Sequence, residues 1–475
     1  MNDDRVAIIS EGRSFTCRDL DDASRRVAGA LLGTRVDLQE ARVAFRITPG
    51  FAYAAVQRGI WRAGGMAVPL AMSHPPAELE YVVRDSGASA VVADADAASL
   101  IGSPPAAALP QVARSRRAMI VYTSGTTGRP KGVVTTHASI EAQVAALIDA
   151  WGWNAADHLL LALPLHHVHG IINGLGSALG ASAVCEILPS FDADRVWERL
   201  SSGEVTVFTA VPTIYHRLVA SWDAASPAVQ RARSAGARRL RLMMSGSAAL
   251  PVHLLERWRA ITDHTLLERY GMTEIGMALS NPLDGERRPG YVGTPLPGVH
   301  ARLVDESGAL VADGTPGELE VRGPAVFLEY WQRPADTLHA FRDGWFRTGD
   351  VAVVEEGAYR LLGRTSVDII KTGGFKVSAL EIEEVLRSHP AIADCAVIGA
   401  ADAEWGERVS AAVELRPAAM LTLEELQAWA REQLAPYKIP RALCTVEALP
   451  RNAMGKVVKP QVAALFSGSS HTGRR

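Results

Sequence analysis

Two periodicities of apolar residues alternate along the first half of this 475-residue chain. Residues 19–32 and 51–62 have the apolar spacing of amphipathic helices. Residues 42–46 and 88–93 are short apolar segments that are typical of strands. Alternation of this kind restricts the chain to an α/β sheet that helices cover on both faces.

The second half of the chain has a different texture. A second α/β stretch is predicted from residue 118, and beyond Gly290 short strands between Gly and Pro turns predict a β-rich subdomain. The fold class is therefore α/β, with a large N-terminal domain at residues 1–365 and a small α+β C-terminal domain at residues 366–475. The C-terminal domain is expected to contain helices at 379–388 and 423–434 and strands near 393–399, 408–415 and 442–446.

Charge and cysteine usage exclude several classes of protein. The 49 basic and 52 acidic residues give a net charge of −3, which argues against a nucleic-acid coat, and 48% hydrophobic residues exclude a wholly disordered chain. The four cysteines form no CxxC pair, so neither a zinc knuckle nor a redox motif is predicted. The start is acidic, and no apolar run approaches the roughly 18–20 residues that span a bilayer. We expect a cytoplasmic protein without a membrane partner.

One loop combines small residues with one of only six lysines, in a chain with 43 arginines. Glycine lets backbone N–H groups close on phosphate oxygens, hydroxyl groups add donors, and Lys131 adds charge. The loop follows an apolar strand at 118–122 and contains no Walker A Gly-Lys-Ser/Thr sequence, and an ordinary surface loop is the alternative. The predicted phosphate-binding residues are Thr123, Ser124, Gly125, Thr126, Thr127, Gly128 and Lys131.

Residues 122–132 resemble the phosphate loop of the adenylate-forming superfamily, which includes acyl-CoA synthetases, adenylation domains and luciferases. In family order, residues 268–274 resemble its Mg-ATP motif, residues 347–350 its ribose motif and residues 450–456 its C-terminal lysine motif. The resemblance covers nearly the whole chain. It implies ATP, Mg²⁺ and coenzyme A, and a mobile C-terminal domain that rotates between an adenylating and a thioesterifying pose.

The resemblance also assigns nucleotide-binding roles. Glu274 and Thr127 would hold Mg²⁺ with hard oxygen atoms, and Thr273 would donate to phosphate. Alone, Glu274 would be read as a solvated carboxylate at a helix end. The other residues assigned to ATP or AMP are Ser245, Gly246, Ser247, Glu268, Arg269, Tyr270 and Gly271.

Two further positions complete the implied adenylation site. Asp350 would accept the ribose hydroxyl groups, with Arg364 beside it, although an isolated Gly-Asp is more often a plain turn. Lys456 would be the catalytic cation, because attack on the α-phosphorus builds negative charge that an ammonium stabilises. Outside the motif, Lys456 would be only a solvated charge.

The C-terminal domain resembles the family in one more segment. Gly373, Gly374 and Lys376 would admit the pantetheine arm of CoA, with a simple hairpin turn as the alternative. The preceding stretch, residues 364–368, is one residue longer than the common pattern. The hinge residue therefore stays open among Ser366, Val367 and Asp368.

A histidine-rich segment resembles the family's substrate gate. His167 occupies its usual histidine position in residues 164–170, and the three histidines at positions 166, 167 and 169 could orient an acyl carboxylate. Packing at a loop bend is the alternative for His166 and His169. A metal site is disfavoured, because no Cys or carboxylate joins the histidines at ligand spacing.

Residues 268–290 resemble malonyl-CoA synthetases, including those that accept methylmalonate. The second carboxylate of malonate needs a cation, since burying it unpaired is costly and a guanidinium can pair it bidentately. Arg287 is the implied cation and Arg288 the near rival, with Ser245 and His167 as hydrogen-bond partners. A solvated pair of surface arginines is the alternative.

The resemblance implies an ATP-dependent acid–CoA ligase that converts malonate, or methylmalonate, to the acyl-CoA through an acyl-adenylate and releases AMP and pyrophosphate. The alternative activates another small or aromatic acid and passes the acyl group to a separate carrier-protein thiol or an amine. A third hypothesis is a non-catalytic nucleotide-binding relative. Such a relative would be expected to lack Lys456, Glu274 or Asp350, and all three are present.

Overall fold

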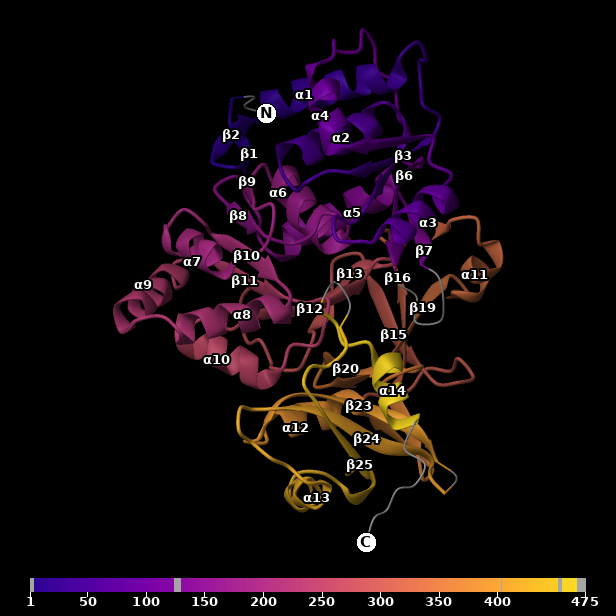
Figure 1. Ribbon diagram of the computed structural model, residues 1–475. Coiled ribbons are helices and arrows are strands. Elements are labelled where there is room, and N and C mark those ends of the chain that lie inside the picture. The colour runs from indigo at the N-terminus through magenta and orange to yellow at the C-terminus, as the bar shows by residue number, and fades with distance from the viewer. Residues whose placement is uncertain (1–3, 124–129, 403, 452–454, 468–475) are drawn as a thin grey trace. The chain divides into compact units, whose positions relative to one another are not determined.

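The computed structural model describes residues 4–123, 130–402, 404–451 and 455–467. The chain divides into two compact units. Unit 1 comprises residues 1–250, 254–301 and 321–346, and unit 2 comprises residues 251–253, 302–320 and 347–475. Figure 1 shows helices and strands in both units, which confirms the predicted mixed α/β class with a large N-terminal and a smaller C-terminal part. The domain boundary expected between residues 365 and 366 stays a prediction.

The largest sheet lies in unit 1 and, within the described residues, has nine strands in the order β14-β13-β12-β11-β10-β8-β9-β1-β2. From β12 to β1 all neighbours are parallel, and antiparallel pairs close both ends. Parallel strands bring their carboxyl ends to one edge, so the segments after β8, β11 and β12 meet there. The strands are β1 (Val6–Ser10), β2 (Arg13–Thr16), β8 (His158–Leu161), β9 (Val184–Ile187), β10 (Val207–Ala210), β11 (Leu242–Ser245), β12 (Leu267–Met272), β13 (Gly276–Ser280) and β14 (Thr294–Pro295).

A second sheet of unit 1 has the order β17-β7-β6-β4-β3-β5. Its strands β6 and β7 are antiparallel, and Thr123 at the end of β6 pairs with Lys131 at the start of β7. The connecting residues 124–129 lie outside the described residues, and with them the predictions for Ser124, Gly125, Thr126, Thr127 and Gly128. The strands are β3 (Arg42–Arg46), β4 (Met66–Pro69), β5 (Ala90–Ala93), β6 (Arg117–Thr123), β7 (Lys131–Thr136) and β17 (Glu329–Tyr330).

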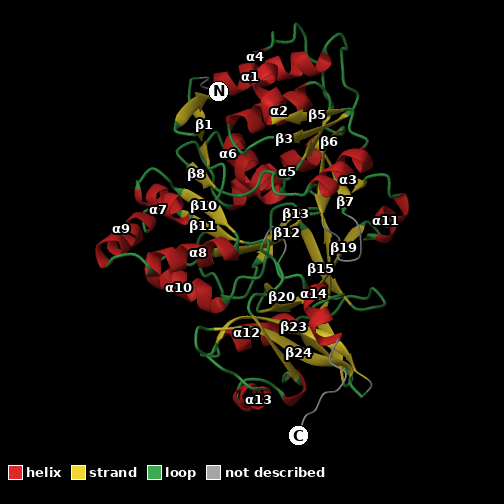
Figure 2. Cartoon of the chain, viewed as in Figure 1, coloured by secondary structure: helices red, strands yellow, loops and turns green. Residues whose placement is uncertain are grey.

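Helices cover these sheets with apolar stripes. Thr16 caps the first helix, accepting from the Asp19 N–H while Asp19 reaches back to the Thr16 N–H. Fully buried Trp197 and Trp258 stack with ring centres 5.5 Å apart in the core. In Figure 2 the helices α7, α8 and α9 lie together beside β10. The helices are α1 (Cys17–Leu32), α2 (Phe51–Arg62), α3 (Pro76–Ser86), α4 (Asp94–Gly102), α5 (His137–Ala150), the π-helix η1 (His169–Gly176), α6 (Ser177–Gly180), α7 (Ala193–Ser201), α8 (Pro212–Asp223), α9 (Pro227–Ala237), α10 (Val252–Thr262) and α11 (Pro334–His339).

The predicted β-rich segment forms a sheet in the order β15-β16-β19-β18, with β20 paired to β19. Glu320 within this sheet is fully buried and accepts hydrogen bonds of 2.9 and 2.7 Å from the guanidinium of Arg302. The chain passes between the two units within β15, β16 and β19. The strands are β15 (His300–Val304), β16 (Gly317–Arg322), β18 (Phe341–Arg342), β19 (Trp345–Glu355) and β20 (Ala358–Arg364).

The C-terminal part of unit 2 is the α+β structure that the sequence predicts. Its sheet has the order β22-β21-β24-β23, with β25 parallel to β24. One face packs an apolar core around Ile382 and Leu426, and the other packs Val462 of the last helix against Ile398. The elements are β21 (Ile369–Thr372), β22 (Phe375–Ser378), α12 (Ala379–Arg387), β23 (Ile392–Asp402), β24 (Gly406–Leu415), α13 (Leu423–Ala430), the 3-10 helix η2 (Pro436–Lys438), β25 (Ala442–Val446) and α14 (Lys459–Ser467).

The four cysteines, Cys17, Cys185, Cys395 and Cys444, are free thiols, and burial raises the pKa of Cys185 and of Cys395.

Every helix in the described segments is too short or too polar to cross a bilayer.

Candidate active site

The segment after β11 combines a buried hydroxyl group with a tight backbone. Ser245 is fully buried, and its Oγ has no hydrogen-bond partner among the described residues. A Cβ on Gly246 would collide with the guanidinium of Arg269, so only glycine fits there. Ser247 follows with a φ of +68°, a left-handed conformation that is uncommon for a non-glycine residue. The predicted segment 245–247 is therefore a strained turn with a polar group facing inward.

A buried histidine and arginine connect β12 to this turn. Arg269 donates to Nε2 of His169 and, at 3.4 Å, to Oγ1 of Thr209, while Nδ1 of His169 lies 3.0 Å from Oγ of Ser247. Burial lowers the pKa of Arg269 to about 9, which leaves it a cation at neutral pH. The ring of His169 therefore lies between the guanidinium of Arg269 and the hydroxyl group of Ser247.

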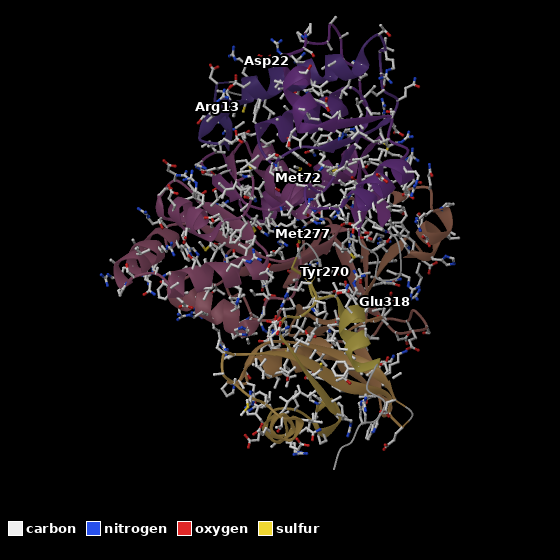
Figure 3. All side chains as sticks on the ribbon, in the orientation of Figure 1. Arg13, Asp22, Met72, Tyr270, Met277 and Glu318 are labelled. Carbon is white, nitrogen blue, oxygen red and sulfur yellow. The ribbon has the colours of Figure 1, made fainter. Side chains whose placement is uncertain are left out.

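The other predicted residues of β12 have main-chain neighbours. The carboxylate of buried Glu268 accepts from the N–H of Gly290 at 3.2 Å. Tyr270 is 9% exposed, and Figure 3 labels it on β12. A Cβ on Gly271 would overlap the carbonyl oxygen of Gly276 across the β12–β13 pair. Glycine at position 271 therefore permits the close approach of these two strands.

The turn between β12 and β13 carries Thr273 and is fixed from α5. Gly276 has a φ of +62°, and a Cβ there would overlap Oε1 of Gln143. That same oxygen accepts a 2.6 Å hydrogen bond from the N–H of Met277, which Figure 3 labels beside Tyr270. The side chain of Gln143 therefore holds the turn that presents Thr273.

Glu274 and Lys131 both interact with Tyr330, one with its hydroxyl group and the other with its ring. Oε1 of buried Glu274 accepts a 3.0 Å hydrogen bond from the Tyr330 hydroxyl. The Lys131 ammonium lies 5.0 Å from the centre of the Tyr330 ring and 3.1 Å from Oδ2 of Asp336. Hydrogen bonding to Lys131 lowers the pKa of Asp336. Tyr330 therefore connects the predicted phosphate-loop lysine with the predicted magnesium carboxylate.

The histidine segment after β8 separates into two environments. The rings of His166 and His167 have centres 4.1 Å apart, and His74 lies 5.6 Å from His166. Burial, and then the charge of His74, lower the pKa of His166 to about 4, so its ring is neutral at physiological pH. His167 is half-buried, and its proposed contact with the acyl carboxylate stays a prediction.

The two candidate arginines have different partners. Arg287 donates from Nε to the Pro282 carbonyl at 3.1 Å, from Nη1 to Thr265 at 2.7 Å and from Nη2 to Leu283 at 2.6 Å. Arg288 instead places its guanidinium carbon 3.9 Å from the centre of the Tyr291 ring. The three carbonyl contacts use three of the five N–H donors of Arg287, and its contact with a substrate carboxylate stays a prediction.

In unit 2 the predicted ribose residues face each other across β19 and β20. Asp350 and Arg364 are register partners, and Nε of Arg364 lies 3.1 Å from Oδ1 of Asp350. The two charges also act on Lys456: desolvation and the charge of Arg364 lower the pKa of its ammonium, and the charge of Asp350 raises it. The neighbouring residues 452–454 of the lysine motif lie outside the described residues.

The predicted CoA segment is a β-hairpin turn between β21 and β22. Gly373 and Gly374 have φ of +54° and +84°, which a two-residue hairpin of this type requires. A Cβ on Gly373 would lie 3.0 Å from the ring of Trp405. Lys376 on β22 pairs with Glu306 at 2.6 Å. The segment is therefore a hairpin turn, and its contact with CoA stays a prediction.

The comparison with protein families identifies the chain. A model described as AMP-binding enzyme matches residues 1–331, and a second, described as AMP-binding enzyme C-terminal domain, matches residues 381–456. The chain belongs to the AMP-binding enzyme family.

Known relatives of this AMP-binding enzyme cover it almost completely. A protein named malonate–CoA ligase ACSF3, mitochondrial, from Mus musculus is 48% identical over 513 residues, which cover 97% of this chain and 88% of the relative. The crystal structure of ATP-bound MatB from Rhodopseudomonas palustris has a TM-score of 0.90 at 33% identity and covers 98% and 97% of the two chains. A malonyl-CoA ligase ternary product complex with methylmalonyl-CoA and AMP has a TM-score of 0.69 at 37% identity and covers 94% and 97%.

Some residues at the site of this AMP-binding enzyme were not predicted from its sequence. Tyr330, Asp336 and Gln143 are far in sequence from the groups they contact, and no local motif marks them. His169 was predicted as one of three histidines that could orient an acyl carboxylate, with packing as the alternative, and its contacts with Arg269 and Ser247 were not predicted. Among the described residues no three His, Cys, Asp or Glu side chains gather as a metal site.

Proposed function

We propose that the chain is an ATP-dependent acid–CoA ligase that converts malonate to malonyl-CoA through an acyl-adenylate. The observation that carries the proposal is the 48% identity, over 97% of the chain, with a relative named malonate–CoA ligase. The family membership supports an AMP-forming ligase, and the polar turn at Ser245 and the Lys131–Tyr330–Glu274 group supply the side chains that this chemistry uses.

In the first step a carboxylate oxygen of malonate attacks the α-phosphorus of ATP, and pyrophosphate leaves. Lys131, at the end of the phosphate loop, attracts the phosphate oxygens, and Thr273 donates to them from the turn that Gln143 holds. Lys456 stabilises the negative charge that builds at the α-phosphate. Asp350, oriented by Arg364, accepts hydrogen bonds from the ribose hydroxyl groups.

Magnesium fits the side chains of this site. Glu274 offers a buried carboxylate oxygen of the hard type that Mg²⁺ prefers, oriented by the Tyr330 hydroxyl. Bound there with the phosphates of ATP, the ion would neutralise charge on the leaving pyrophosphate. Thr127, the second proposed ligand, lies outside the described residues.

In the second step the CoA thiol loses its proton, its sulfur attacks the acyl carbon and AMP leaves. Gly373 and Gly374 are the proposed passage for the pantetheine arm, because a Cβ on Gly374 would meet no atom within 4 Å and the backbone there is open to a close approach. The solved ligase complex with methylmalonyl-CoA and AMP supports the proposal that methylmalonate is also accepted.

For the second carboxylate of malonate we propose Arg287 as the cation, with Arg288 as the near rival. Three of the five guanidinium N–H groups of Arg287 donate to main-chain carbonyls, which fixes the side chain and leaves one further N–H on each of Nη1 and Nη2 beyond these contacts. Two N–H groups of one guanidinium can pair a carboxylate bidentately. Ser245, buried with an unpartnered Oγ among the described residues, and His167 remain the proposed hydrogen-bond partners.

A panel of acids tests the substrate. Pyrophosphate release is measured with malonate, methylmalonate, succinate, acetate and benzoate, with CoA and an acyl-carrier protein supplied in parallel as acceptors. Malonate with CoA should give the highest kcat/KM. A higher kcat/KM with acetate or benzoate would overturn the malonate assignment, and transfer only to the carrier would overturn the acceptor.

The cytoplasmic location stays a prediction, because the relatives named ACSF3 are also named mitochondrial. Fractionation of the producing cells, followed by detection of the chain, would decide it.

A further inference from the structure

A buried lysine close in sequence to the proposed catalytic lysine has no part in the chemistry above. Lys459 is the first residue of α14, three residues after Lys456, and its side chain is only 12% exposed. Its Nζ lies 2.6 Å from Oδ1 of Asp368 and 2.8 Å from Oε1 of Glu383. The ammonium and the two carboxylates stabilise one another, since each charge would be costly to bury alone.

Asp368 belongs to the turn between β20 and β21, where the hinge residue was left open. Its Oδ2 accepts a 3.0 Å hydrogen bond from the N–H of Arg364, and its own N–H donates to the Arg364 carbonyl at 2.8 Å. Its carbonyl accepts from the N–H of Ala379 at 2.7 Å. The carboxylate of Asp368 therefore joins the turn on one side to Lys459 on the other.

The same turn positions Arg364, whose side chain pairs with Asp350. Both of these charges act on Lys456, as its shifted pKa indicates. Lys459 therefore contacts Asp368, Asp368 contacts Arg364, and Arg364 contacts Asp350. Lys456, on which both charges of the last pair act, is three residues before Lys459 in the chain.

Other contacts hold the segment in place without the charge of Lys459. The N–H of Val458 donates to the Pro450 carbonyl at 2.8 Å, and fully buried Val462 packs against Ile398 and Leu449. These contacts would keep α14 on its sheet in a variant that lacks the ammonium. The Lys459–Asp368 pair adds a fixed distance between the segment and the turn.

We propose that Lys459 is a positioning residue: through Asp368 it holds the Lys456 segment against the turn that presents the Asp350–Arg364 pair, and so supports adenylation. The inference rests on the proposed function for the role of Lys456. It concerns one half-reaction only, because the contacts of Lys459 lead to the proposed ribose residues and not to the glycine turn proposed for CoA.

The test compares the two half-reactions in the full-length Lys459→Met variant. We expect acid-dependent pyrophosphate release to fall about tenfold or more in kcat with the KM for ATP within about twofold of wild type. Transfer to CoA from a chemically prepared acyl-adenylate should stay within about twofold. Lys459→Arg, which keeps the charge, should recover part of the loss.

Lys438→Met is the matched control. Lys438 is a partly buried lysine of the same unit, paired with Glu381 at 2.5 Å and not with the turn at residues 364–368. Both half-reactions should stay at the wild-type rate in this variant. If Lys459→Met does not fold, Asp368→Asn removes the same ion pair with little change in volume and should give the same split.

Unchanged adenylation in Lys459→Met, or equal loss of both half-reactions, would overturn the positioning role. The comparison uses whichever acid wild type activates fastest. Failure of wild type to release pyrophosphate with malonate would overturn the substrate assignment alone. The comparison of adenylation with transfer to CoA in the Lys459 variant would still test the positioning role.

Discussion

Arg287 and Arg288 are adjacent in the sequence, but their guanidinium groups have different partners. The family resemblance implies Arg287 as the cation for the second carboxylate, with Arg288 as the near rival. Only the fold reveals that Arg287 also donates to the carbonyls of Pro282, Thr265 and Leu283. Thr265 is 22 residues from Arg287 in the sequence, and no local sequence pattern predicts that contact.

Variants of the two arginines separate the proposed cation from its rival. Arg287→Ala should lower kcat/KM for malonate about a hundredfold and lower kcat/KM for propanoate much less, since only malonate loses a charge partner. The same variant should lower the free energy of unfolding by about 2–4 kcal/mol, because three main-chain carbonyls lose a charged donor. Pyrophosphate release with both acids and urea unfolding measure these effects. A selective loss for malonate in Arg288→Ala, with equal losses for both acids in Arg287→Ala, would give the role to Arg288.

His166 makes the stability of the fold depend on pH. Its pKa is lowered from 6.5 to about 4 in the folded chain, mainly by burial, so the unfolded chain binds this proton at higher pH. Its contribution is complete above pH 6.5 and is lost as the pH falls towards 4. In His166→Gln the free energy of unfolding should fall less between pH 7 and 4.5, by at most about 3 kcal/mol. Urea unfolding at several pH values measures this, and parallel curves for the two proteins would contradict it.

The elements themselves were predicted well where their pattern is local. Residues 42–46, 51–62 and 442–446 match β3, α2 and β25 at both ends. The helix expected at 423–434 ends at Ala430, four residues earlier than expected. Pairing was not predictable, because a strand pattern does not name its partner: β1 lies beside β9, almost 180 residues later in the chain.

The π-helix η1 is one of the elements that the sequence analysis did not predict, and it contributes Asn173 to a small cavity. The cavity measures about 10 Å³ and is lined by Thr135, Gln143, Asn173 and Thr273 among others. Both polar atoms of Asn173, Nε2 of Gln143 and Oγ1 of Thr135 are buried without a hydrogen-bond partner in the described protein. The size and the donors suit one water molecule.

A crystal structure of high resolution should show one ordered water in this cavity, hydrogen-bonded to Asn173 and Gln143. In Asn173→Leu, which replaces the amide with an apolar group of similar size, the water should be absent. In Thr135→Ser, which keeps the hydroxyl group, it should remain. A cavity without density in the wild-type crystal would contradict the interpretation.

At the scale of the whole molecule, the proposed catalytic residues divide between the two units. Lys131, Thr273 and Glu274 belong to unit 1, and Asp350 and Lys456 to unit 2. The order of motifs along the sequence was enough to assign these residues to one family. It did not indicate that β19 contains the passage from one unit to the other, because that follows from contacts that only the fold makes.

This division predicts a variant that separates the two half-reactions. Lys456→Ala should lower adenylation about a thousandfold or more, because the cation acts on charge that develops in that step. Transfer of the acyl group from prepared acyl-adenylate to CoA should stay within about threefold of wild type. Pyrophosphate release and thioester formation measure the two steps separately. Adenylation at the wild-type rate in this variant would remove Lys456 from the mechanism.

The most direct measurement is product analysis of the wild-type chain with malonate, ATP, Mg²⁺ and CoA. Mass spectrometry and a pyrophosphate assay would quantify malonyl-CoA, AMP and pyrophosphate over time. The proposed function predicts the three products in equal amounts, all dependent on malonate and ATP. Formation of ADP and phosphate in place of AMP and pyrophosphate, or no malonyl-CoA while another acid is converted, would contradict it.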